Sequence, residues 1–170
     1  MTSSMTFELL LRTLIIGVGA TLAMDLWGLL LRMLGIPTLN FGLLGRWLGH
    51  LPEGQWAHEN ITKAAPVRGE RILGWLAHYT IGLSFAALLL AAYGLEWARS
   101  PSIGPALWIG VVTVAAPLLI LQPALGAGVA STKTPRPLFN SLKSLATHTV
   151  YGLGLYATAV AAAAVIPAAG

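Results

Sequence analysis

The sequence predicts an all-α membrane protein with four transmembrane helices in a bundle, and two observations lead to that prediction. Of the 170 residues, 56% are hydrophobic and only 9% are charged, whereas soluble domains carry about 25% charged residues. The charges also leave three long uncharged stretches, at residues 73–95, 100–132 and 144–170. Because about 20 apolar residues of helix cross the roughly 30 Å hydrocarbon core of a bilayer, such stretches predict membrane spans. We therefore expect one integral membrane domain over residues 1–170, with the lipid bilayer as its partner.

The first span is expected at about residues 13–31, and it contains one charged residue, Asp25. A cleaved signal peptide is the alternative, because residues 20–23 loosely resemble a cleavage region. However, the apolar character continues to Leu31, and the apolar core of a signal peptide has only about 7–15 residues. We therefore expect this segment to be retained as a span.

The later spans are expected at about residues 72–95, 103–125 and 144–166. They should be helices, because lipid offers the backbone no hydrogen-bond partners and each segment must satisfy its own N–H and C=O groups. The intervening loops, at about residues 32–71 and 126–143, then lie on one side of the membrane.

The basic residues predict which side this is. Two of the ten lie on the side of the termini, Arg12 and Arg99, and eight lie in the two loops on the other side. Because cytoplasmic loops carry an excess of Lys and Arg, we expect the loops in the cytoplasm and both termini outside it, in the periplasm of a double-membraned bacterium. The net charge of +4 reflects this topology, and we expect no nucleic-acid partner.

The first loop contains a short segment, residues 41–49, that suits the headgroup region of the bilayer. Its Trp47 and leucines are typical of a membrane interface, although its three glycines disfavour a helix. His50 and His58 follow beside Glu53 and Glu59 and complete no zinc-protease pattern, so we interpret them as ordinary loop histidines.

Two short segments hint at an internal repeat. Both the second and fourth spans contain His-x-x-x-Gly-Leu, at His78–Leu83 and His148–Leu153. Two parallel helical hairpins are therefore one arrangement that the sequence leaves open, although short glycine-rich matches arise easily in apolar sequence.

Four polar residues lie at a similar expected depth in four spans: Asp25, His78, Gln122 and His148. Asp25 and His78 are each seven residues from a flanking arginine, on the order of 10 Å at 1.5 Å per residue. Ionisable residues inside a span are costly and usually functional. We take these four as candidates for a ligand site or a proton relay, and structural hydrogen bonding between helices is the alternative.

Small residues should bring these polar groups together, since small side chains let membrane helices approach closely. Gly82 follows His78 at a spacing of four, and Gly152 and Tyr156 follow His148 at the same spacing. An Asp25–histidine pair, with Gln122 and either Tyr156 or Ser144 completing the hydrogen bonds, would satisfy such a layer.

The third span should be interrupted near its end. Pro117 and Pro123 each remove a backbone donor, and Gly126 and Gly128 permit backbone approach or unwinding. Interrupted helices coordinate ions and substrates in transporters, but an ordinary helix end is equally consistent with this pattern.

The chemistry stays open. The chain has no cysteine, which excludes disulfides and thiolate sites, and no serine-hydrolase signature. Two histidines on separate helices suit axial haem ligation, but no motif supports it, so we assign no metal and leave the cofactor unknown. The leading hypothesis is a binding or transport component for a small molecule or proton, within a homo-oligomer or a larger membrane complex. A non-catalytic scaffold or accessory subunit and a membrane enzyme with a lipid-like substrate are the alternatives.

Three strings carry a family resemblance: residues 17–27, residues 66–79, and Gln122–Gly128 with Thr134–Pro137. In this order they resemble a bacterial membrane family that is known only as a domain of unknown function. The resemblance covers nearly the whole chain and implies a bacterial inner-membrane protein of about four spans. It implies no activity, ligand or residue role.

Overall fold

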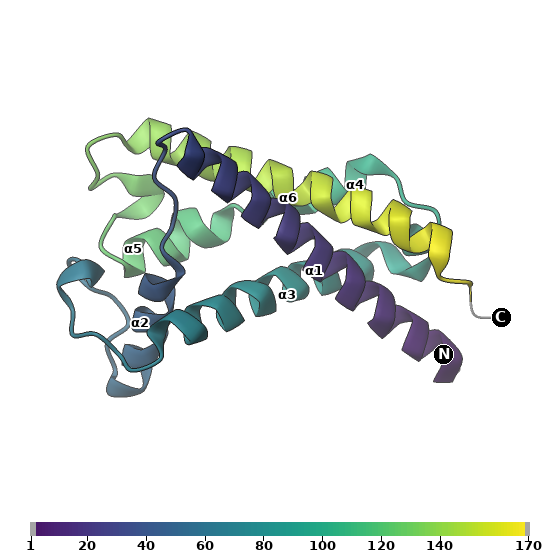
Figure 1. Ribbon diagram of the computed structural model, residues 1–170, viewed down its shortest axis with the longest axis horizontal. Coiled ribbons are helices and arrows are strands. Elements are labelled where there is room, and N and C mark those ends of the chain that lie inside the picture. The colour runs from purple at the N-terminus through teal and green to yellow at the C-terminus, as the bar shows by residue number, and fades with distance from the viewer. Residues whose placement is uncertain (1–2, 169–170) are drawn as a thin grey trace. The chain divides into compact units, whose positions relative to one another are not determined.

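The computed structural model describes residues 3–168, in which helices are joined by turns and loops and no strand occurs (Figure 1). The helices, in chain order, are α1 (Ser3–Met33), α2 (Phe41–His50), α3 (Glu70–Arg99), α4 (Ile103–Val112), a π-helical turn (Ala116–Leu121), α5 (Gln122–Ala124) and α6 (Pro137–Val165). Short 3₁₀ turns occur at Leu51–Glu53, Ile61–Lys63 and Val129–Ser131.

Four of these segments have the length and composition to cross a membrane: Ser3–Met33, Glu70–Arg99, Ile103–Ala124 and Pro137–Val165. The predicted fold class is therefore confirmed: the protein is all-helical, with four long apolar helices compatible with a transmembrane bundle. The helix α1 begins ten residues before the apolar run, so that Glu8 and Arg12 belong to the helix rather than to a leading segment.

The described residues form two compact units. The first unit combines residues 3–30, 79–112 and 147–168, and the second combines residues 31–78 and 113–146. The expectation of one integral membrane domain stays a prediction.

Small residues make close helix contacts in the first unit. A Cβ atom on Gly110 would lie 2.6 Å from the Gly152 Cα atom, and one on Gly154 would lie 2.9 Å from the Ala20 Cα atom. Only glycine permits such approaches, as expected where van der Waals packing holds membrane helices together. The surrounding core consists of larger apolar side chains, including Ile16, Leu89, Leu90, Ile109 and Leu155.

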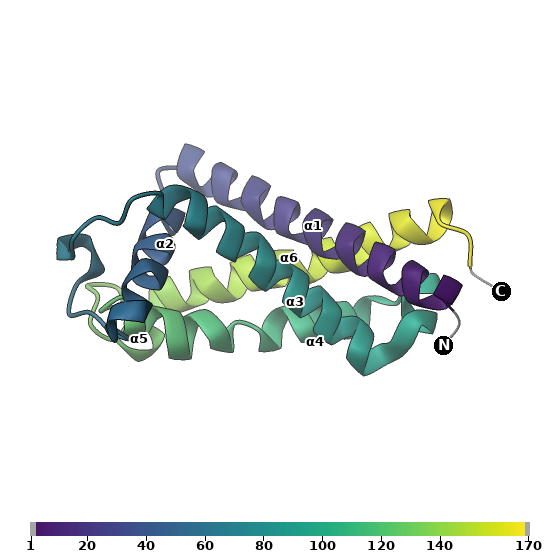
Figure 2. The same ribbon diagram turned by 90° about the horizontal axis from the view of Figure 1, so that it is seen from below.

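The start of α1 and the ends of α3 and α6 lie together at one end of the first unit (Figures 1 and 2). Arg12 on α1 donates to the carbonyl oxygens of Ala98 (3.1 Å) and Ile166 (2.8 Å). This arrangement agrees with helices that alternate in direction along the chain.

The third span is interrupted as its prolines predict. Regular α-helix ends at Val112, and a π-helical turn that contains Pro117 precedes α5. A proline inside a helix removes one donor and clashes with the preceding turn, and π-helical turns are a common local accommodation in membrane helices.

In the second unit, the predicted interfacial segment forms the helix α2 in spite of its glycines. Asn40 caps it, with its side-chain oxygen accepting from the Gly42 N–H (2.9 Å). A Cβ atom on Gly45 would lie 1.8 Å from the Glu70 carbonyl oxygen, and one on Gly74 would lie 1.7 Å from the Phe41 carbonyl oxygen. These glycines therefore let α2 and the first turns of α3 meet backbone to backbone.

Candidate functional site

Asp25 and Tyr79 form a polar pair between α1 and α3 in the first unit. The Tyr79 hydroxyl donates to Asp25 Oδ2 at 2.9 Å, and both side chains are half-buried. Half a turn further along α1, the Trp27 indole N–H donates to Thr147 Oγ1 on α6 at 3.3 Å. A carboxylate inside a span thus has a neutral hydroxyl donor from a neighbouring helix.

His148 is buried in the first unit, with only 9% of its surface exposed. Its ring lies 6.4 Å, centroid to centroid, from Phe85. One turn later on α6, Tyr151 donates to the carbonyl oxygen of Gly82 at 2.6 Å. A Cβ atom on Gly82 would lie 2.0 Å from Thr21 Oγ1, so this glycine marks a close helix approach.

The predicted supporting residues Gly152 and Tyr156 lie on the same helix. Gly152 is the residue that Gly110 approaches. Tyr156 is half-buried and packs against the apolar core.

His78 lies in the second unit, near the start of α3. Its ring stacks on Phe41, with centroids 4.0 Å apart and an interplanar angle of 24°. Trp75 contacts both rings at 4.7 and 5.8 Å. The result is an aromatic cluster that joins α2 to α3.

Gln122 joins the broken third span to α6 and to the following turn in the second unit. Its Nε2 donates to Ser144 Oγ (3.2 Å), and its Oε1 accepts from Ser131 Oγ (2.9 Å). Ser131 and Ala130 have positive φ values of 61° and 49°, which non-glycine residues adopt only at a cost in free energy.

The two candidate glycines after Gln122 have left-handed backbones, with φ of 95° at Gly126 and 76° at Gly128. A Cβ atom on Gly126 would lie 2.2 Å from the Glu59 carbonyl oxygen. Beside it, the His58 N–H donates to the Ala124 carbonyl oxygen at 2.9 Å. The first loop therefore contacts the end of α5 at this unwound stretch.

The four candidate residues are thus divided equally between the units: Asp25 and His148 belong to the first unit, and His78 and Gln122 to the second. Each has its own partner within its unit. The predicted Asp25–histidine pair and the common polar layer stay predictions.

Sequence reasoning missed the ion pair between Arg46 on α2 and Glu70 on α3. Arg46 Nε and Nη2 donate to the two carboxylate oxygens of Glu70, both at 2.8 Å, and Nη1 donates to the carbonyl oxygens of Ile61 and Ala64. The hydrogen bonds from Arg46 to Glu70 raise the pKa of Arg46, so that the guanidinium stays charged. One side chain therefore holds the first loop against two helices.

Sequence reasoning also missed a contact between two loop histidines. His50 Nδ1 lies 2.9 Å from His58 Nε2, and His50 Nε2 lies 3.0 Å from the carbonyl oxygen of Ala65. Pro52 and Gly54 lie between the histidines, and such turn residues were the only sequence signal that the chain reverses here. A cleft of about 630 Å³ opens beside the pair, lined by these histidines together with Glu53, Glu59, Asn60 and Lys63.

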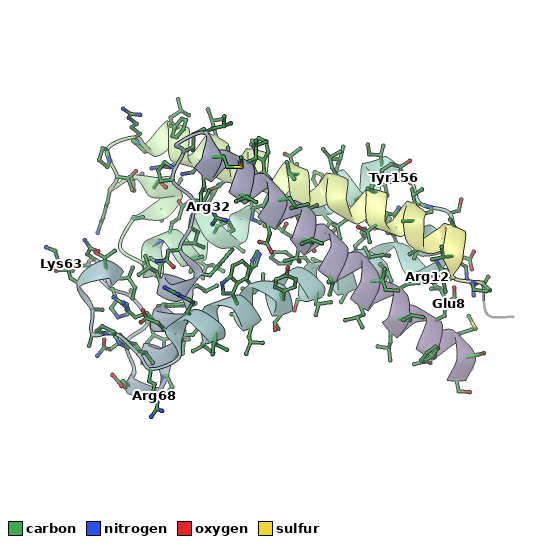
Figure 3. All side chains as sticks on the ribbon, viewed as in Figure 1. Glu8, Arg12, Arg32, Lys63, Arg68 and Tyr156 are labelled. Atoms are coloured by element: carbon green, nitrogen blue, oxygen red, sulfur yellow. The ribbon has the colours of Figure 1, made fainter. Side chains whose placement is uncertain are left out.

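A third group that the sequence did not reveal lies in the first unit (Figure 3). Glu8 accepts from Arg12 (2.7 Å) and from Arg99 (2.6 Å), and it is only 3% exposed. Arg12 and Arg99, which the sequence placed on the side of the termini, therefore share one buried carboxylate.

Among residues 3–168, no group of three or more His, Asp or Glu side chains is placed to hold a metal ion. No curated protein and no solved structure matches the chain. One family does match, over residues 14–162, and its description is "Protein of unknown function (DUF2938)". Because the match covers most of the chain, this membrane protein belongs to the DUF2938 family.

Proposed function

We propose that this protein is a multi-pass component of the bacterial inner membrane that binds a proton or a small molecule within its spans. The observation that carries the proposal is the hydrogen bond between Tyr79 and Asp25. An ionisable carboxyl group inside a membrane helix is energetically costly, and such groups usually have a function. A carboxyl group can bind and release a proton, and Tyr79 on a neighbouring helix donates to one of its two oxygens.

Two features support a binding or transport component rather than an enzyme. Asp25 and its donor lie on separate long helices, α1 and α3, so that a change in helix packing would change the contact between them. The third span is interrupted near Gln122, as are helices that line substrate paths in transporters. The division of basic residues supports cytoplasmic loops and periplasmic termini.

Proton flux across a vesicle membrane tests this proposal. The full chain is reconstituted into vesicles that contain a pH-sensitive dye, and an imposed pH difference drives proton flux. Asp25→Asn, which has nearly the same shape but cannot titrate, should reduce the flux at least about tenfold and leave the unfolding temperature in detergent nearly unchanged. Tyr79→Phe keeps the carboxylate and should shift the pH dependence of the flux instead.

The same variants test the alternative, in which the Asp25–Tyr79 pair has only a structural role. If Asp25→Asn lowers the unfolding temperature and the wild-type vesicles show no flux above empty vesicles, the pair is a structural link and the proposal fails. That outcome would favour the scaffold or accessory subunit.

A further inference from the structure

One side chain that lines the cleft beside His50 and His58 has a ring nitrogen that no group among residues 3–168 satisfies. His58 Nδ1 is buried and has no hydrogen-bond partner among the described residues. A buried polar atom without a partner is unfavourable, so such an atom calls for an explanation.

The directions of the hydrogen bonds between these histidines follow from the carbonyl group of Ala65, which can only accept. A backbone carbonyl only accepts, so the 3.0 Å contact with Ala65 requires a proton on His50 Nε2. In the neutral ring, His50 Nδ1 is then an acceptor, and the proton in the 2.9 Å contact belongs to His58 Nε2. The neutral pair therefore leaves His58 Nδ1 as a lone pair that needs a donor.

The cleft has the charge and the size for a small cationic donor. Its lining contains the carboxylates of Glu53 and Glu59 against one ammonium group, Lys63, and Glu53 and Glu59 are exposed. Its volume of about 630 Å³ lies within the range of roughly 300–1,000 Å³ typical of small-molecule sites. His58 is one of the residues that line this cleft, and because its Nδ1 is covered, a donor group reaches that atom once the side chains of the cleft shift around the ligand.

The surrounding bonds hold the site in place without the ligand. The His58 N–H is bonded to Ala124, and Arg46 binds the carbonyl oxygens of Ile61 and Ala64. Asn60 Oδ1 already accepts from the backbone N–H and the hydroxyl of Thr62. The side-chain acceptors left for a ligand are therefore the His58 ring, the two carboxylates and the Gln55 amide oxygen.

We infer that this cleft is a binding site for a small organic cation with a protonated amino group, which donates to His58 Nδ1 and pairs with Glu53 or Glu59. The site lies wholly in the second unit and shares no residue with the Asp25–Tyr79 pair. Its test can therefore fail while the proposed function stands, and the reverse also holds.

Three molecules of equal chain length test the charge requirement: putrescine as the cation, butanediol as the neutral match and succinate as the anion. The purified full chain is titrated with each in detergent, and the four histidines are followed by nitrogen NMR after histidine-specific labelling. Putrescine should bind and move the Nδ1 signal of His58 more than the signals of His78 or His148, whereas butanediol and succinate should not bind.

Substitutions of residues that line the cleft test whether putrescine binds there. His58→Gln should weaken putrescine binding at least about tenfold, as expected for loss of a hydrogen bond to a charged group, and His78→Gln is the matched control outside the cleft. Should His58→Gln fail to fold, Glu53→Gln and Glu59→Gln, at exposed positions, should together give the same loss. Equal binding of butanediol, no binding of putrescine, or binding that survives all three cleft changes would overturn the inference and leave water as the donor to His58.

Discussion

At the scale of single residues, Arg12 shows how a charge is accommodated in an apolar protein. It is only 1% exposed, yet each of its three nitrogens donates to an acceptor: the Glu8 carboxylate and the carbonyl oxygens of Ala98 and Ile166. These two carbonyl groups lie at the ends of α3 and α6, where the last backbone oxygens of a helix lack internal donors and the helix dipole attracts a cation. Arg12 therefore neutralises a buried carboxylate and caps two helices at once.

Replacing Arg12 with methionine should be strongly destabilising. The change leaves Glu8 with less compensation and two helix ends without a donor, and loss of one member of a buried ion pair costs about 3–5 kcal/mol. The expected result is a markedly lower unfolding temperature in detergent, measured by tryptophan fluorescence. Arg68→Met, at an exposed position in the second unit (Figure 3), should change it little, and an equal loss in both variants would contradict this role of Arg12.

At the scale of elements, packing rather than local preference decides where α2 forms. Three glycines in ten residues disfavour a helix, and the sequence accordingly predicts this segment only as an interfacial stretch. The same glycines allow the contact that stabilises it, because Gly45 and Gly74 bring the backbones of α2 and α3 together. The Arg46–Glu70 ion pair adds a polar contact between the same two helices.

This contact predicts opposite effects for two glycine-to-alanine changes in long helices. Gly74→Ala places a methyl group against the Phe41 carbonyl and should destabilise the protein by about 1–3 kcal/mol. Gly28→Ala, in α1, meets nothing within 4 Å and should be neutral or stabilising by up to about 1 kcal/mol, because alanine favours helix. Unfolding in detergent measures both, and a benign Gly74→Ala would show that α2 can separate from α3 at little cost.

At the scale of the whole molecule, the basic residues are distributed unequally between the two compact units. All eight basic residues that the sequence assigned to the loops belong to the second unit, and the two in the first unit, Arg12 and Arg99, are bound by Glu8. Among the described residues, the second unit therefore carries eight basic side chains against two in the first, and the expectation that the loops face the cytoplasm stays a prediction.

The absence of cysteine makes this orientation simple to measure. In intact spheroplasts, a membrane-impermeant maleimide should label Ser100→Cys, and it should label Arg68→Cys only after the membrane is permeabilised. Both positions are exposed, so access to the reagent depends on the side of the membrane. Labelling in the reverse order would show that the termini are cytoplasmic.

The sequence alone determined the membrane helices and the break in the third, because both follow from local rules. Lipid forces the backbone to bond within each apolar segment, and Pro117 disrupts a helix wherever it occurs inside one. Only the tertiary structure decided the partners of the polar groups. Tyr79 is 54 residues from Asp25, and Glu70 is 24 residues from Arg46, so these pairs depend on how each helix is rotated against its neighbour. The His50–His58 contact depends in the same way on a loop whose course is set by Arg46, and no local pattern in the sequence encodes such long-range geometry.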